Sequence, residues 1–267
     1  LCKPEIKSKS KKAFISFTKL RHLLVEQLNT DELYVTNDLT LGTNKKNDYN
    51  GLLLYGTNAV GKTCFIKSIG IAVVMAQSGL YVPCSTFKFS PYNAIFTRIL
   101  GNDNLFKGLS TFAVEMSELN TIINLSDENS LILGDELCSG TESDSALSIF
   151  TTGLEDLHKK KSTFLFATHF HEVADYDEIK NLKKLILMHM TVKYDKKTKK
   201  LIYNRKLKEG SGETMYGLEV CKSLNIPEEF LVRAHAIRIK YKKINDNILI
   251  NNESKYNKKK IKNKCYM

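Results

Sequence analysis

The sequence lacks the features that would place it in a membrane or an oxidising compartment. No apolar run approaches the roughly 20 residues needed to span a bilayer, so we expect no membrane partner. The first twelve residues are rich in lysine and contain no apolar segment, so no secretory signal is predicted. The first residue is Leu1 rather than Met, so we expect a piece of a longer protein. No C-x-x-C pair is present, which argues against zinc and disulfide frameworks and for an intracellular location. The six cysteines are Cys2, Cys64, Cys84, Cys138, Cys221 and Cys265.

The body of the chain also lacks net charge. Residues 1–12 hold five Lys and one Glu (+4), and residues 240–267 hold nine Lys with one Asp and one Glu (+7). These ends account for the whole formal charge of +11 and leave residues 13–239 neutral. A neutral body does not predict a nucleic-acid surface. The basic ends fit either solvated linkers or contacts with nucleic acid.

The stretch GTNAVGKT matches the phosphate-binding P-loop, G-x-x-x-x-G-K-T. An apolar run at 52–55 precedes it, and the apolar segment 64–77 follows it, so strand, loop and helix come in the order that the motif requires. Backbone N–H groups and the helix N-terminus would hold phosphates, with Lys62 reaching the β- and γ-phosphates and the Thr63 hydroxyl binding Mg²⁺. The predicted nucleotide-binding residues are Gly56, Thr57, Asn58, Ala59, Val60, Gly61, Lys62 and Thr63.

The second motif is acidic: Asp135 and Glu136 end the apolar strand predicted at 130–136 (SLILGDE). Two carboxylates at the end of a buried strand are costly unless they meet a cation. We expect Asp135 to hold Mg²⁺ and Glu136 to orient and deprotonate the attacking water, although a pair that merely caps the strand is the alternative. His169 follows the next buried strand, 162–167, and is placed to sense the γ-phosphate. A metal site with His171 and Glu172 is less favoured, because H-x-H on a strand end puts the rings on opposite faces.

Strands alternate with helices along the chain, and the motifs follow strand ends. This pattern predicts an α/β fold of P-loop NTPase type, with an open, mostly parallel sheet flanked by helices. Ser110 opens one helix, where serine is either an N-cap or a functional group. Residues 13–50 read as strands that lead to the P-loop strand. The other predicted strands are 94–99, 185–190 and 201–207, and the predicted helices are 110–125, 143–158, 216–224 and 227–240.

Over roughly residues 20–240 the chain resembles the ATPase domain of the MutS DNA mismatch-repair family, a branch of the ABC ATPase class. The most specific block is STFAVEMSEL at 110–119, where other ABC ATPases carry a sequence like L-S-G-G-Q. The chain departs from the family at Val60, which replaces a glycine, and at 137–141 (LCSGT), which lacks an arginine. The other matching blocks are Arg21-His22, GTNAVGKT, MAQSGLYVPC at 75–84, IFTRILGNDNL at 95–105, SLILGDELCSGTES at 130–143, FATHFHE at 166–172 and EGSGETMYGLEV at 209–220.

The resemblance implies a composite ATP site. Two ATPase domains of a homodimer or heterodimer would face each other head to tail, with Ser110 of one approaching the γ-phosphate of the other. Asn58 would contact the γ-phosphate region, and Tyr34 would stack on adenine, although a core tyrosine is its alternative. The catalytic residues would be Lys62, Glu136 and His169. Mismatched double-stranded DNA would be bound by domains outside this piece.

We therefore divide the chain into a basic linker (1–19), an ATPase domain (20–215), a dimerising helix-turn-helix (216–240) and a Lys- and Asn-rich tail (241–267). The tail also fits a linker to the nuclease domain of the divergent MutS proteins that occur in giant viruses and mitochondria. Two alternative functions stay open: the ATPase head of another ABC-type DNA-maintenance protein, and a DNA-tethering module with a relic nucleotide site. The signature block argues against the first, and the intact motifs argue against the second.

Overall fold

The computed structural model describes residues 1–8, 10–29, 32–43, 48–57, 59–99, 111–138, 141–195, 200–212, 217–224 and 226–241. The chain forms two compact units. The first comprises residues 1–193 and 203–214, and the second comprises 194–202 and 215–267. Within the described ranges, no helix is both long and apolar enough to cross a membrane.

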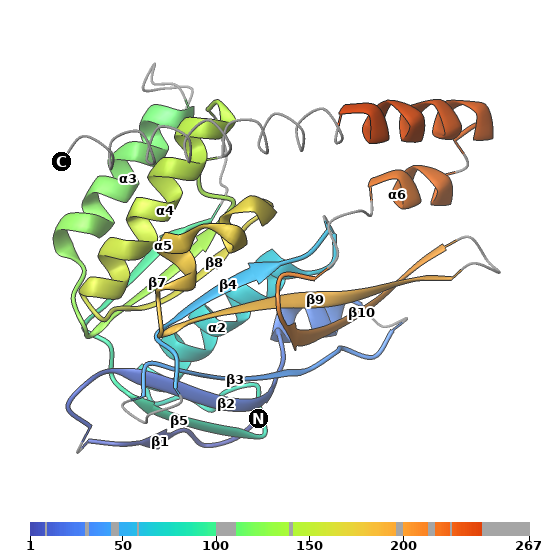
Figure 1. The fold of residues 1–267 in the computed structure, drawn as a ribbon. Helices are drawn as coiled ribbons and strands as arrows, with labels where there is room; N and C mark the ends of the chain where they lie inside the picture. Colours follow the sequence, from blue (N-terminus) through green and yellow to red (C-terminus); the bar gives the residue numbers. More distant parts are fainter. Residues whose placement is uncertain are drawn as a thin grey trace, which may run out of the picture. The chain divides into compact units, whose positions relative to one another are not determined.

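A six-stranded sheet carries the predicted motifs, in the strand order β10-β9-β4-β8-β7-β6 (Figure 1). The four neighbouring pairs from β9 to β6 are parallel. The prediction of a mixed α/β fold with a mostly parallel sheet is confirmed. The strands are β4 (Gly51–Tyr55), β6 (Ala94–Arg98), β7 (Ser130–Asp135), β8 (Thr163–Ala167), β9 (Leu185–Asp195) and β10 (Lys200–Glu209).

Helices pack on both faces of this sheet because its central strands are apolar on both sides. All five residues of β4 are buried. Its alternate side chains belong to different clusters: Leu52 and Leu54 to one, Leu53 and Tyr55 to the other. The first cluster contains α2 (Lys62–Gln77), and the second contains α3 (Thr111–Leu125) and α4 (Ser143–Lys159). Two short helices, η2 (His171–Asp175) and α5 (Asp177–Lys180), follow β8.

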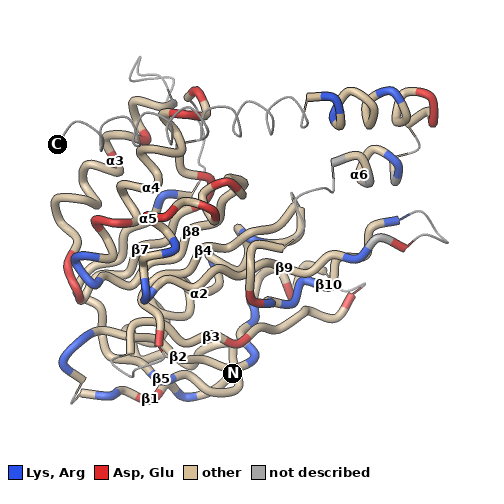
Figure 2. Tube along the Cα trace, in the orientation of Figure 1, with Lys and Arg blue, Asp and Glu red and all other residues tan. Residues whose placement is uncertain are grey.

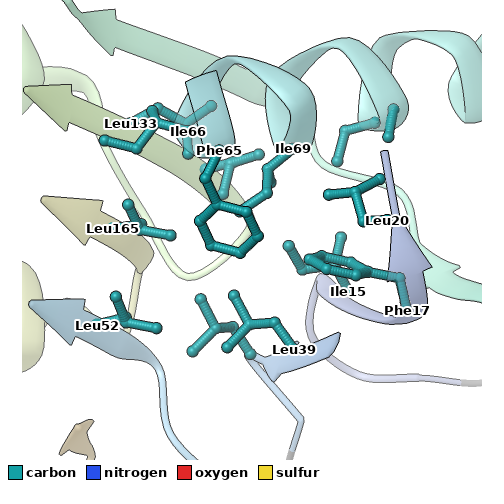
Figure 3. Close-up of a cluster of buried hydrophobic side chains, with 14 of the residues drawn as sticks. Ile15, Phe17, Leu20, Leu39, Leu52, Phe65, Ile66, Ile69, Leu133 and Leu165 are labelled. Carbon is teal, nitrogen blue, oxygen red and sulfur yellow. The ribbon is translucent and has the colours of Figure 1, made fainter. Parts of the chain in front are cut away.

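A second, four-stranded sheet lies on the other side of α2, in the order β1-β5-β2-β3. Its strands are β1 (Glu5–Ile6), β2 (Phe14–Leu20), β3 (Asn37–Leu41) and β5 (Thr86–Ser90). Figure 3 shows how the two sheets share a core: Phe65 and Ile69 of α2 lie between Leu52 and Leu165 of the large sheet and Phe17 of the small one. Apolar burial on both sides thus fixes α2, and with it the loop that precedes α2.

The structure differs from the expectation of a basic linker over 1–19. Within that segment β1 pairs with β5, and β2 pairs with both β5 and β3. The reason is the alternation in FISFTKL, which buries Ile15 and Phe17 on one face. Even Lys12 is buried, at 5% exposure, and this burial lowers the pKa of its ammonium group to about 8.

The expectation of strands throughout 13–50 is wrong at one place. Residues Leu23–Leu28 form a short helix, α1. The imidazole Nδ1 of His22 caps it by accepting a hydrogen bond from the Val25 N–H at 3.4 Å. This helix forms one wall of the cavity described below.

The second unit contains α6 (Gly217–Ser223) and a helix over residues 228–241, close to the two helices that the sequence predicts. Lys222 Nζ lies 4.0 Å from Glu228 Oε1 across their connection. The helix-turn-helix stays a prediction, and all but the first residue of the predicted tail lies outside the described residues. Figure 2 shows Lys and Arg interspersed with Asp and Glu over the described chain, in keeping with the neutral body.

Candidate nucleotide-binding site

Strand register brings the predicted motifs to one edge of the large sheet. Ala167 of β8 is paired with Leu54 of β4 on one side and with Asp135 of β7 on the other. Beyond these pairs, the Thr168 N–H donates to the Leu54 carbonyl (3.1 Å), and the Glu136 N–H donates to the Ala167 carbonyl (3.0 Å). The P-loop, the acidic pair and His169 therefore leave the sheet side by side, as expected for parallel strands.

The P-loop has a positive φ at three described positions, Gly56 (152°), Ala59 (64°) and Gly61 (108°), the last being the N-cap of α2. The departure from the family glycine at Val60 is accommodated without a positive φ. Val60 is fully buried in the core beneath the loop, and a Cβ built on Gly56 would lie 2.9 Å from its Cγ1. Val60 thus attaches the loop to the core. Asn58 lies outside the described residues.

Lys62 projects into the loop that precedes it. Its ammonium group donates to the carbonyls of Gly56 (2.8 Å) and Thr57 (3.3 Å), and the residue is 5% exposed. Burial lowers the pKa of Lys62, and the nearby carboxylates of Glu136 and Asp135 oppose that shift. A buried cation held by carbonyls at a helix N-terminus is suited to an anionic ligand.

Thr63 and Asp135 form a pair of oxygen ligands. The Thr63 hydroxyl donates to Oδ2 of Asp135, which is 2% exposed. The other carboxylate oxygen, Oδ1, is buried and has no hydrogen-bond partner among the residues that the structure describes. An unpaired buried carboxylate oxygen is costly, and a divalent cation would satisfy it. These residues therefore fit a divalent cation such as Mg²⁺.

Glu136 directly follows β7 and adopts left-handed backbone (φ 54°), which is strained for a residue with a Cβ. One carboxylate oxygen, Oε1, lies 2.5 Å from Nε2 of His169. His171 has a different neighbour, since its ring centroid lies 5.0 Å from that of Tyr55, and burial lowers its pKa. The structure thus brings Glu136 and His169 together, and their roles as a base and a γ-phosphate sensor stay predictions.

A cavity of about 210 Å³ opens beside the P-loop. Tyr34 lines it, and its hydroxyl lies 3.6 Å from Sγ of Cys64. Burial raises the pKa of Tyr34. The cavity walls that come from α1, β9 and β10 were not predicted from the sequence, because no local motif marks them. The lining residues are Val25, Glu26, Asn29, Glu32, Leu33, Tyr34, Val35, Asn37, Ala59, Val60, Gly61, Cys64, Phe65, Met190 and Arg205.

The signature block is only partly described. Ser110 lies outside the described residues, as do Ser139 and Gly140, whereas α3 begins at Thr111. A buried ion pair attaches α3 to the sheet: Nη2 of Arg98 on β6 lies 2.7 Å from Oε1 of Glu115, with side chains 7% and 1% exposed. Glu118 lies 3.1 Å from Nε of the same guanidinium group. No sequence motif marks this pair.

Known proteins resemble the chain over nearly its whole length. The family profile of MutS domain V matches residues 52–242. The chain is 37% identical to a DNA mismatch repair protein mutS homolog of Acanthamoeba polyphaga mimivirus, over 99% of this chain and 26% of that protein. It is 38% identical to the mitochondrial mutS homolog of Sarcophyton glaucum (91% and 23%) and 36% identical to MutS of Chlorobaculum parvum (84% and 25%). The chain thus spans about a quarter of the length of these relatives.

Proposed function

Since the chain belongs to the MutS DNA mismatch-repair family and corresponds to its domain V, we propose that it binds and hydrolyses Mg-ATP. The observation that carries this proposal is the arrangement at the sheet edge. Thr63, the partly unpaired Asp135, Lys62 and the Glu136–His169 pair all converge there. A glycine loop that matched the motif by chance would not bring these groups together from three separate strand ends.

Each residue has a role that its position supports. The N-terminus of α2 and Lys62 hold the phosphate groups, and Tyr34 with the cavity walls holds the adenine. Thr63 and Asp135 hold Mg²⁺, which supplies electrostatic stabilisation of the charge that develops during phosphoryl transfer. Glu136 accepts the proton of the attacking water, and His169 fixes the carboxylate of Glu136 and senses the γ-phosphate.

We propose further that two such domains act together, head to tail, as a homodimer or heterodimer. The block at 110–119, with α3 beginning at Thr111, supports a site that the partner's Ser110 completes. The second unit exposes apolar side chains suited to assembly, with Leu224 70%, Phe230 60% and Val232 62% exposed. The nucleotide state would then control the binding of mismatched DNA by domains outside this chain.

Nucleotide binding is tested first by replacing Lys62 with Ala. Loss of a buried, charged hydrogen-bond donor should weaken Mg-ATP binding about 10- to 100-fold in isothermal titration calorimetry. Lys67→Ala, which removes the same charge from an exposed position of the same helix, is the matched control and should bind normally. An unchanged affinity in Lys62→Ala would contradict the proposed phosphate site.

The composite site is tested by sedimentation velocity of Glu136→Gln with and without Mg-ATP. We expect an ATP-dependent dimer that Ser110→Arg abolishes, because the added side chain would clash at the partner's γ-phosphate. Ser117→Arg, at an exposed position of α3, should leave the dimer intact. A dimer that persists in the Ser110→Arg variant would exclude the role of this serine across the interface.

A further inference from the structure

The cavity beside the P-loop has a wall that is attached to the molecule through one buried amide. Asn37, the first residue of β3, is 6% exposed and lines the cavity. Its Nδ2 donates to the Arg205 carbonyl (3.0 Å), and its Oδ1 accepts from the Leu207 N–H (2.9 Å). A single side chain thereby satisfies an acceptor and a donor on β10, as a neighbouring strand would.

The other contacts between residues 32–37 and β10 are exposed. Lys206 donates through Nζ to the Thr36 carbonyl, and Arg205 Nη1 lies 3.6 Å from Glu32 Oε2. The Arg205 and Glu32 side chains are 37% and 70% exposed, so this ion pair contributes little in water. The buried amide of Asn37 is therefore the main attachment of residues 32–37 to β10.

Tyr34 depends on this attachment. Residues 33–36 form neither helix nor strand, so no regular backbone pairing holds them. The segment is instead held by Asn37 on one side of Tyr34 and by the approach of the Tyr34 hydroxyl to Cys64. These contacts set the position of the Tyr34 ring relative to the P-loop wall of the cavity.

The backbone of β10 departs from regular strand geometry at the same point. Arg205 has left-handed backbone (φ 55°), and its carbonyl is the one that accepts from Asn37. A strained residue persists where its surroundings hold it in place, and the Asn37 amide bonds the carbonyl of Arg205 and the N–H of Leu207, two residues further on. The left-handed backbone of Arg205 and the hydrogen bond from Asn37 therefore occur at the same peptide of β10.

We infer that Asn37 is a positioning residue that sets the affinity of the site for the adenine base, independently of the phosphates. This inference rests on the proposed function. The phosphate groups are held by the P-loop and Lys62, none of which contacts Asn37 through a described hydrogen bond. Disturbing Asn37 should thus weaken the binding of ligands that carry the base and spare those that lack it.

The experiment compares the dissociation constants of Mg-ATP and of inorganic tripolyphosphate, which has no base. Asn37→Asp keeps the shape but replaces the donor to Arg205, and Asn37→Ser removes both bonds without adding charge. Either variant should weaken ATP binding about 5- to 20-fold, the range of one or two lost hydrogen bonds, and change tripolyphosphate binding less than twofold. Lys206→Ala, which removes an exposed contact between the same segments, should change neither.

A double-variant cycle adds a readout that a general loss of structure would not give. If Asn37 acts through Tyr34, then Asn37→Ser should weaken ATP binding little further in a Tyr34→Leu background. An equal loss of ATP and tripolyphosphate binding, or a full additional loss in the Tyr34→Leu background, would overturn the inference. A parent chain that binds tripolyphosphate but not ATP would also overturn it, whereas one that binds neither would overturn the proposed function itself.

Discussion

The Glu136→Gln variant is expected to bind Mg-ATP as the parent chain does and to hydrolyse it about 10²- to 10⁴-fold more slowly, the usual effect of removing a general base. The amide cannot take a proton from water, yet it has nearly the shape of the carboxylate that lies against His169. Single-turnover hydrolysis, measured with the chain in excess over ATP, separates the chemical step from assembly and product release.

Two comparisons make this result specific. Glu172→Gln, at an exposed position three residues after His169, should leave turnover unchanged. Asp135→Asn should instead raise the Mg²⁺ concentration needed for ATP binding, because it alters a metal ligand rather than the base. Turnover at the parent rate in Glu136→Gln would remove Glu136 from the role of general base.

The second large effect concerns stability. Arg98→Met should lower the free energy of unfolding by about 3–5 kcal/mol, the cost of leaving one member of a buried ion pair unpaired. Glu115 is fully buried, and its Oε2 already lacks a hydrogen-bond partner among the described residues. Urea denaturation followed by circular dichroism measures the change.

A double variant separates the burial of a charge from the loss of packing. Replacing both partners, Arg98→Met with Glu115→Leu, should recover most of the lost stability, because no unpaired charge is left inside. Lys88→Met removes a lysine that lies 3.6 Å from Glu5 at the surface, and it should cost less than about 1 kcal/mol. A loss as small as this in Arg98→Met would contradict the structural role assigned to the buried pair.

The residues of the proposed phosphate and metal sites could be found in the sequence because each lies within a few residues of a strand end. GTNAVGKT, the Asp-Glu pair and His169 follow β4, β7 and β8, whose apolar runs are visible in the sequence. Parallel strands bring such ends to one edge whatever the length of chain between them. The backbone turns at Ala59 and Glu136 could not be predicted, since neither residue type favours left-handed backbone.

The cavity proposed to hold the adenine could not be predicted in this way. Met190 and Arg205 reach the cavity only through the pairing of β9 with β4 and of β10 with β9. Asn37 contacts a strand 168 residues further along the chain. Local sequence patterns do not reveal such long-range contacts. An isolated asparagine at the start of a strand resembles an ordinary turn residue.

The small sheet could be predicted only in part: strands were expected over 13–50, but not the pairing of β2 and β3 with β1 and β5 in one sheet. Its strands come from separated segments, 5–6, 14–20, 37–41 and 86–90, and residues 1–12, which contain the first of them, hold five lysines. This composition suggests a basic linker over 1–19. The alternation in β2 was nevertheless a sign of a half-buried strand.

The place of β2 within that sheet matters for how the protein is produced. β2 lies between β5 and β3, and the ring of Phe17 stacks on that of Phe87, with centroids 6.2 Å apart. A truncation at residue 20, where the sequence suggested a boundary, would remove this central strand. It would leave β5 and β3 with open edges and expose Phe87 and Phe89, a combination that favours intermolecular strand pairing and insoluble product. Expression should therefore retain the residues from Cys2 onward.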